Sequence, residues 1–376
     1  MEISSLFFGR IQFELTVTLF YTFIGLSIGL AFLLAVGFAG KHSNESHFNS
    51  ETFRVWLRIF ALTLFSAFAL GFLTIVEIGV VWPIMIERMG NVFGPLMFFA
   101  VVIFVVLKST ALDVMLFGKQ RASVAQYKWA MWLVLFGLTL VAYFVIVFDS
   151  WTRQPAGTMM LDGRYRIYEW AELFVQPAAY LQSVEFFLQT IYSTAGVCLG
   201  FSAWQSKFRP LQDGHIIFLK RALKWGVLAL LVHATLMWFL YTNNGLPYKI
   251  EIDRVYFLTW LSFCITLFIW LVAAYLSLKL FNNQLKPKLA FIFGAPLGMI
   301  IPALAWLTNS DFRSEFAVMN ALKAADVITA TPTTSIALGL ILLLALFSLI
   351  IFGFVRLSGY AMKQGVVPVV KSGGAP

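Results

Sequence analysis

Charged side chains are scarce in this sequence. Asp, Glu, Lys and Arg together make up 12% of the 376 residues, whereas they form about a quarter of an ordinary soluble domain. Hydrophobic residues account for 60% and aromatic residues for 17%. Such a chain has too little polar surface to cover a water-soluble fold. The composition therefore excludes a soluble globular domain and indicates an integral membrane protein.

Residues that build metal and catalytic sites are also few. The two cysteines, Cys198 and Cys264, lie in apolar stretches without the spacing of a zinc site or of covalent heme attachment, so we expect buried small hydrophobic residues. Of the four histidines, we expect only His233 to lie within a helix. No glycine-rich phosphate loop, Ser-His-Asp set or zinc-binding helix stands out. The sequence thus indicates no independent active site, and we expect no bound metal.

The sequence is rich in long apolar runs. At least eight of them exceed the roughly 18 to 20 residues that a helix needs to cross a bilayer. We predict an all-α fold, a polytopic transmembrane helix bundle that forms a single domain over residues 1–376. The predicted helices cover residues 12–39, 53–82, 92–117, 124–148, 179–204, 217–241, 253–281, 288–308 and 334–360. We further expect Trp82-Pro83 to be an interfacial anchor and a helix stop, and Tyr165–Pro177 to lie along the membrane surface.

The distribution of Lys and Arg predicts how the helices cross the membrane. With the N-terminus outside, the inner segments hold about 17 basic residues and the outer segments about 9, as the positive-inside rule requires. We therefore predict a multi-pass protein of the cytoplasmic (inner) membrane, with its N-terminus outside and its C-terminus inside. The net charge of +9 follows from this topology and from attraction to anionic lipid headgroups, so nucleic acid is not an expected partner.

The first apolar run, residues 9–35, has a distinctive order of residues. Arg10-Ile11-Gln12-Phe13 and Leu15-Thr16 are followed by Gly29 and by Ala31-Phe32-Leu33-Leu34-Ala35. This order resembles the first helix of subunit I of cytochrome bd-type quinol oxidases. The resemblance implies a heme-ligating histidine on this helix, but an ungapped overlay puts Phe20 there. Because a phenyl ring has no lone pair for iron, we expect it to fill space that porphyrin occupies in the family.

Further stretches extend the resemblance over nearly the whole chain. They are Gly90–Leu96 as the lead into the third helix, Asp149–Pro155 as a Trp-containing outer loop, Gly200–Trp204 at the end of the fifth helix, and Phe293–Leu297 with Trp306 and Arg313 in the eighth. The connection Thr242–Asp253 is much shorter than the quinol-binding loop that the resemblance implies there.

The family's ligand positions carry other residues in this chain. By the same overlay, the two acidic residues of the third helix become Ala100 and Lys108. The histidine of the low-spin heme becomes Glu185, the ligating methionine becomes Ser262, and the carboxylate of the high-spin heme becomes Ser310, or Asp311 after a shift of one residue. Since a lone glutamate is a poor substitute for an axial imidazole, the resemblance implies that the hemes are lost.

Lys108 is expected near the middle of the membrane, where an ammonium group is costly unless it is paired or reaches water. Two readings stay open: a lysine that snorkels or is capped by carbonyls, or a charge that replaces a cofactor contact or blocks a proton path. Asp113 is on the same predicted helix, but a separation of five residues is poor for a direct ion pair.

Four polar side chains are expected at similar depth near the outer ends of their helices: Glu14, Glu77, Glu185 and His233. They are predicted to form a polar cluster in the space of a family heme. One interpretation is a hydrogen-bonded histidine that joins two helices. The other is a relocated heme ligand or a proton-carrying group.

Three functional hypotheses follow. The leading one is a non-catalytic, heme-free subunit of a cytochrome bd-like respiratory complex, a scaffold for a heme-bearing cytochrome bd-like partner subunit that carries heme b or heme d. The second is a subunit that binds one heme b through His233 or Glu185 and passes electrons to a c-type cytochrome. The third is a proton or ion path through Lys108, Asp113, Glu14 and Glu185.

Overall fold

The computed structural model describes residues 5–39, 48, 50–118, 122–206, 213–242, 316–318, 322, 323 and 333–364. Within them, seven long helices form a bundle, and six of these are long and apolar enough to cross a membrane. The expected multi-pass helical fold is confirmed. The predicted helices over 253–281 and 288–308, with Ser262, Cys264 and Ser310, lie outside the described residues, and nine helices remains an approximate count.

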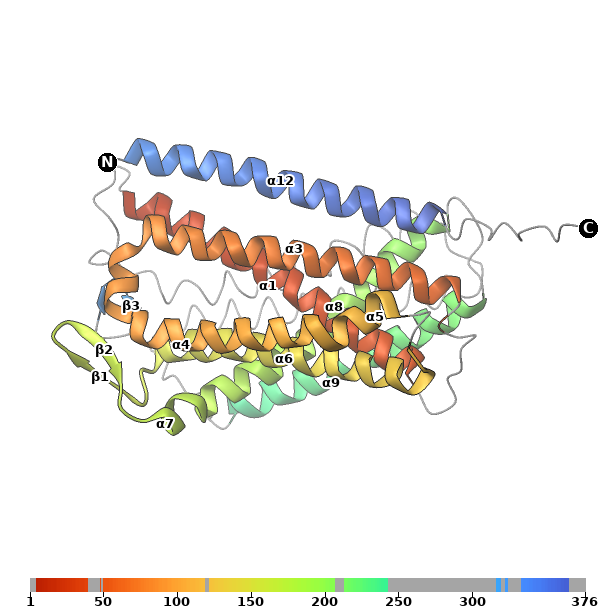
Figure 1. Cartoon of the computed structure of the whole chain (residues 1–376), viewed down its shortest axis with the longest axis horizontal. Helices are drawn as coiled ribbons and strands as arrows, with labels where there is room; N and C mark the ends of the chain where they lie inside the picture. The colour runs from red at the N-terminus through yellow and green to blue at the C-terminus, as the bar shows by residue number, and fades with distance from the viewer. Residues whose placement is uncertain are drawn as a thin grey trace, which may run out of the picture.

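Helix α1 (Ser5–Phe38) is the central helix of the bundle (Figure 1). It is apolar on all sides, which fits a helix that is surrounded by protein. The helices that it contacts are α3 (Glu51–Val81), α6 (Val124–Arg153), α8 (Pro177–Gln205), α9 (Asp213–Thr242) and α12 (Thr333–Gln364).

The contact between α1 and α8 depends on glycine. A Cβ atom placed on Gly29 would lie 2.5 Å from the carbonyl oxygen of Thr190 and 2.1 Å from Oγ1 of Thr194. One turn earlier, a Cβ on Gly25 would lie 3.2 Å from Cγ2 of Thr190. Small residues at this spacing let the two backbones approach closely, as is usual between membrane helices.

The corner between α3 and α4 has no loop. The backbone N–H of Trp82 donates to Ile78 at 3.1 Å and closes α3, and Pro83 begins α4 (Pro83–Leu107) in the first position, where its missing N–H costs nothing. The predicted stop is therefore present. The chain is helical from Pro83 rather than from residue 92, so Gly90–Leu96 lies inside α4 and does not lead into it.

Helix α4 continues without interruption through a π-helical turn, η1 (Lys108–Leu112), into α5 (Asp113–Phe117). The hydroxyls of Ser109 and Thr110 donate to the carbonyls of Val105 and Val106, at 2.9 and 2.7 Å. Hydroxyls that bond back to the preceding turn favour such local changes of helical pitch.

A β-hairpin joins α6 to α8. Strands β1 (Thr158–Leu161) and β2 (Arg164–Ile167) pair antiparallel, and Asp162 and Gly163 form the two-residue turn with φ of 52° and 73°. Two positive φ angles are typical of a type I′ turn, for which Asp-Gly is a favoured pair. The stretch Tyr165–Pro177, expected to lie along the membrane surface, contains the end of β2 and the short helix α7 (Trp170–Phe174), and most of its residues are exposed.

The hairpin is anchored on the helices beneath it. Tyr165 is buried, with its ring 5.0 Å from that of Trp151, and the indole N–H of Trp151 donates to Thr158 at 3.0 Å. Asn91 donates to the carbonyl of Tyr165 at 3.1 Å. Glu172 accepts bonds from the N–H of Gly157 and from the hydroxyl of Tyr168. The hairpin thus closes one end of the bundle.

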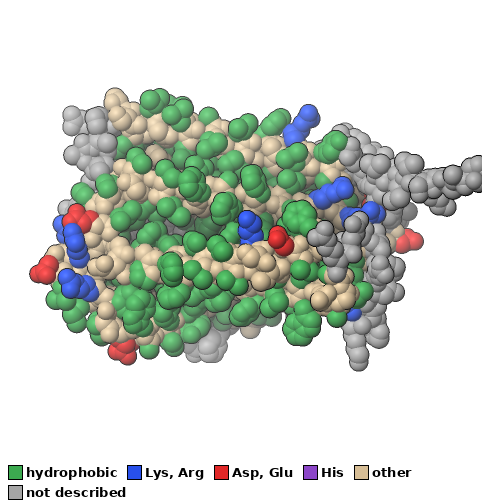
Figure 2. All heavy atoms as spheres, viewed as in Figure 1, with side chains coloured by type: hydrophobic (Ala, Val, Ile, Leu, Met, Phe, Trp, Pro, Cys, Tyr) green, Lys and Arg blue, Asp and Glu red, His purple; other side chains and the backbone are tan. Residues whose placement is uncertain are grey.

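The start of α1 and the hairpin lie at the same end of the bundle, and α12 ends at the opposite end (Figure 1). This arrangement agrees with termini on opposite sides of a membrane, while the direction, N-terminus outside, stays a prediction. Hydrophobic side chains cover most of the face shown in Figure 2, and charged ones gather toward its two ends. A second two-stranded sheet, β3 (Phe316–Val318) with β4 (Leu322–Lys323), completes the described elements.

Candidate functional site

Phe20 packs between α1 and α3. A Cβ atom on Gly71 would lie only 3.0 Å from Cε2 of the Phe20 ring. The ring also stands edge to face with that of Tyr21, at 5.7 Å between centroids, and Tyr21 makes a similar contact with Phe186 of α8 at 5.5 Å. At this position the described residues form an aromatic cluster from α1 and α8 that packs against Gly71 of α3.

Ala100 and Lys108, which the overlay matches to the family's two acidic residues on the third helix, have different surroundings. Ala100 is buried in α4, with a methyl group as its side chain. Lys108 is exposed on the outer surface of η1, together with Ser109 and Thr110. A lysine that faces outward is not placed to contact a cofactor inside the bundle.

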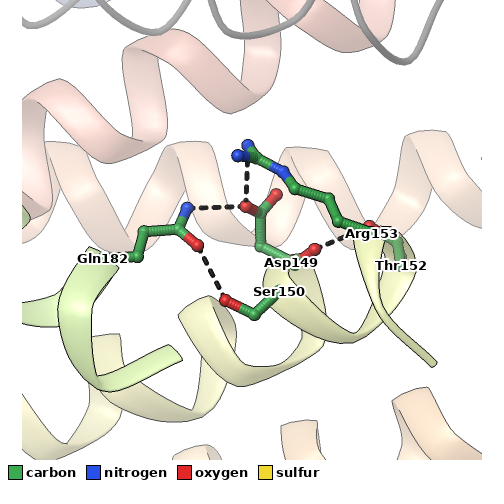
Figure 3. A network of polar contacts seen from close by, with 5 residues as sticks. All are labelled: Asp149, Ser150, Thr152, Arg153 and Gln182. Carbon is green, nitrogen blue, oxygen red and sulfur yellow. Dashed lines mark hydrogen bonds and ion pairs between the residues drawn. The ribbon is translucent and has the colours of Figure 1, made fainter. Parts of the chain in front are cut away.

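A polar network joins the end of α6 to α8 (Figure 3). The carboxylate of Asp149 accepts a hydrogen bond from the amide of Gln182 at 2.6 Å and pairs with the guanidinium of Arg153 at 3.1 Å. Ser150 donates to the other end of the Gln182 amide at 2.8 Å, and Thr152 donates to the carbonyl of Asp149 at 2.7 Å. Asp149 is buried, and the guanidinium beside it compensates for a negative charge at a helix C-terminus.

This network corrects the expectation that Asp149–Pro155 forms an outer loop. Residues 149–153 are the last turn of α6, which runs to Arg153 rather than to residue 148. The polar side chains satisfy one another inside the protein, so the helix does not have to end where the hydrophobic run ends.

Glu185 lies one turn further along α8 than Gln182. It interacts electrostatically with Arg153 on one side and with Tyr192 on the other. The hydroxyl of Tyr192 is 3.4 Å from Nδ1 of the buried His233, and the two rings stack at 5.9 Å between centroids. Tyr192 thus joins α8 to α9 through His233, while Glu185 interacts with Arg153 and Tyr192 only electrostatically.

The structure therefore brings together only part of the expected cluster of Glu14, Glu77, Glu185 and His233. Tyr192, which sequence reasoning missed, contacts His233 from α8; its place two turns beyond Glu185 on the same helix was the available signal. Glu14 lies beside Arg10, one turn earlier on α1. Glu77 of α3 is buried and close to Thr16, whose hydroxyl donates to the carbonyl of Gln12 at 2.9 Å. Within the described part of the chain, neither carboxylate oxygen of Glu77 has a hydrogen-bond partner.

His215 is a second buried histidine within a helix. Helix α9 begins at Asp213, earlier than predicted, so the expectation that only His233 lies in a helix is wrong. The Nε2 atom of His215 lies 3.0 Å from the hydroxyl of Ser202, and the ring of His215 is 5.8 Å from that of Trp56. The acidic Asp213 at the helix start was the sequence signal that we did not use.

The residues that the overlay predicts at the family's ligand positions do not supply an axial ligand pair for heme, as far as the structure describes them. Phe20 and Ala100 offer no donor atom, Lys108 faces outward, and Glu185 stands beside Arg153. Ser262 and Ser310 lie outside the described residues. No group of three or more His, Cys, Asp or Glu side chains among the described residues is arranged to hold a metal ion.

Comparison with known proteins places these observations in a family. The family model described as cytochrome bd terminal oxidase subunit I matches residues 8–247. The chain is 24% identical over 222 residues to cytochrome bd ubiquinol oxidase subunit 1 of Bacillus subtilis, covering 59% of this chain and 46% of that protein. It is 28% identical over 199 residues to cytochrome bd-II ubiquinol oxidase subunit 1 of Escherichia coli, covering 52% and 38%.

The fold has a solved counterpart in the bd oxidase from Geobacillus thermodenitrificans. The TM-score is 0.78 at 14% sequence identity, with 96% of this chain and 98% of that chain covered. An identity this low shows the fold alone. The matched part of the chain spans less than half the length of each of the two curated relatives.

Proposed function

The chain belongs to the cytochrome bd terminal oxidase subunit I family, and on this premise we propose that it is a heme-free, non-catalytic subunit of a respiratory membrane oxidase. It acts as a scaffold for a heme-bearing partner subunit. Heme b or heme d is bound by that partner, and electron transfer runs through the partner alone. The complex lies in the cytoplasmic membrane, with the N-terminus of this chain outside.

The observation that carries the proposal is the contact between Phe20 and Gly71. An axial histidine needs open space beyond its ring for the porphyrin plane. Here the ring at that position lies against the backbone of the neighbouring helix, with Tyr21 and Phe186 beside it. This packing supports a core that is stable without a cofactor.

The surroundings of Glu185 also support a subunit that binds no heme. Glu185 interacts electrostatically with Arg153, whose guanidinium forms its ion pair with Asp149 instead. A carboxylate held in this way contributes to packing between α6 and α8 and is a weak candidate for iron binding.

Heme content tests the proposal directly. The chain is expressed alone, purified in detergent, and assayed for its Soret band and by pyridine hemochromogen, with a heme-bearing oxidase from the same host as the positive control. We expect far less than one heme per chain. A Soret band with one heme per chain would overturn the proposal.

One observation favours a second candidate function, a subunit that binds one heme b and donates electrons to a c-type cytochrome. His233 is buried in the bundle, and its Nδ1 lies 3.4 Å from the hydroxyl of Tyr192. Under this hypothesis His233→Ala abolishes the Soret band of the purified chain while the matched Tyr192→Phe keeps it. An identical spectrum for wild type and His233→Ala removes the hypothesis.

A further inference from the structure

Three buried side chains that carry oxygen atoms lie where α1, α3 and α12 pack on one another. Glu77 of α3 is 3% exposed, and Gln12 and Thr16 of α1 are 6% and 0% exposed. The carboxylate of Glu77 lies close to the hydroxyl of Thr16. Gln12 is one turn before Thr16 on the same face of α1, and its Oε1 would lie 3.7 Å from a Cβ atom placed on Gly339 of α12.

The hydrogen bonds at this junction leave acceptors without donors. The hydroxyl of Thr16 donates its single hydrogen to the backbone carbonyl of Gln12 at 2.9 Å, so it presents lone pairs to Glu77. Among the described residues, both carboxylate oxygens of Glu77 and Oε1 of Gln12 have no hydrogen-bond partner. A buried carboxylate that faces other acceptors is strongly unfavourable unless a positive charge lies between them.

The described part of the chain supplies no such charge. Arg10 of α1 is two positions from Gln12, so the two side chains point about 200° apart around the helix. Arg10 interacts instead with Glu14, which is one turn further along that other face. The ion pairs that the described residues form lie on α6 and between the hairpin and α4, away from Glu77.

We propose that Glu77, Thr16 and Gln12 bind a monovalent alkali cation, sodium or potassium. Carboxylate, hydroxyl and amide oxygens are the donors that hard cations take. One carboxylate balances one positive charge, whereas a divalent cation would leave an excess charge in an apolar interior. Because two of the three donors are neutral, no pattern of His, Cys or paired acidic residues marks this site in the sequence.

The position of the site lets an ion enter from water. Gln12 is about 10 Å along α1 from its first residue, Ser5, and Glu77 is about 6 Å from Val81, the last residue of α3. The start of α1 lies at the hairpin end of the bundle (Figure 1). A bound ion would join α1 to α3 between this end and the contact of Phe20 with Gly71, and it requires neither a heme nor a partner subunit.

Thermal unfolding of the detergent-purified chain tests the proposal. The midpoint is measured against increasing NaCl or KCl, with choline chloride keeping the ionic strength constant, since choline is too large for a site between packed helices. An ion that binds only the folded state raises the midpoint with its concentration. We expect this response in wild type, with an apparent affinity that Glu77→Gln weakens by at least about tenfold. Glu87→Gln, which removes an exposed carboxylate, is the matched control and keeps the wild-type response.

Thr16→Val is the second variant and tests the site even if Glu77→Gln fails to accumulate. It removes one donor oxygen and is expected to weaken the apparent affinity by about tenfold. Thr63→Val is its control, because Thr63 is equally buried and donates to the carbonyl of Phe60 at 2.8 Å, on a different part of α3. Equal midpoints in all three salts, as a protonated Glu77 or an internal water would give, overturn the inference. A cation response that neither Glu77→Gln nor Thr16→Val changes also overturns it.

Discussion

The ring of Phe20 lies against the backbone of Gly71, where a Cβ atom would come within 3.0 Å of Cε2. By the family overlay, Phe20 stands in the place of a heme ligand. Gly71, which has no side chain, leaves the space that the Phe20 ring needs. The pair joins α1 to α3 at the point where the resemblance implies a cofactor.

Gly71→Ala is expected to destabilise the protein by about 1 kcal/mol, because the added methyl group forces the Phe20 ring to move. The measurement is the thermal unfolding midpoint of the detergent-purified chain. Gly79→Ala on the same helix is the matched control, since a Cβ there meets nothing within 4 Å. Phe20→Leu should restore stability in the Gly71→Ala background, and equal midpoints for the two alanine variants would contradict this account.

Gly29→Ala is expected to cost more, about 3 kcal/mol, because the obstacle includes the backbone carbonyl of Thr190 at 2.5 Å and a carbonyl cannot rotate aside. The same unfolding assay applies, with Gly94→Ala in α4 as the control that has open space. Thr194→Ala in the Gly29→Ala background should recover only a small part of the loss. Full recovery of the unfolding midpoint by Thr194→Ala would show that crowding by the Thr194 side chain, and not by the Thr190 carbonyl, causes the loss of stability.

The buried and the exposed ion pair should differ in their contribution to stability. Asp149→Asn removes the charge that Arg153 pairs with and is expected to cost about 1 to 2 kcal/mol. Glu87→Gln breaks the exposed pair with Arg164 and is expected to cost less than about 0.5 kcal/mol. Both variants are compared by unfolding midpoint at low and at high salt. A larger effect from Glu87→Gln would refute the structural role of the network in Figure 3.

Tyr165 in the hairpin predicts a pH effect. Burial raises the pKa of its phenol above the ordinary value, and among the described residues its hydroxyl has no hydrogen-bond partner. A pKa raised by folding means that the stability from this group is present below about pH 10 and is lost as the pH rises above that value. The unfolding midpoint should therefore drop more between pH 8 and pH 11 in wild type than in Tyr165→Phe. Equal drops would show that this tyrosine does not titrate as the fold implies.

Elements whose signal is local could be predicted from the sequence. The apolar runs located the membrane helices, and Trp82-Pro83 marked the break between α3 and α4, because hydropathy and a missing N–H act within a few residues. The Asp162-Gly163 pair is an equally local turn signal, which the sequence-based prediction did not include.

The ends of the helices could not be predicted in the same way. Residues 149–153 are as polar as a loop, yet they continue α6 because Gln182 of another helix meets the carboxylate of Asp149. The end of α6 thus depends on Gln182, which is 33 positions from Asp149 in the chain. Hydropathy is a local property and does not predict such a contact.

The sequence by itself determined the membrane-spanning helical class and the family resemblance, because these depend on composition and on residue order; the residues at the family's ligand positions stay a prediction of the overlay. The tertiary structure decided that Phe20 packs on Gly71, that Tyr192 contacts His233, and that a π-helical turn brings Lys108 and Asp113 to one face. Each of these relationships depends on the distance between helices or on a local change of helical pitch. Neither quantity is written in the order of the residues.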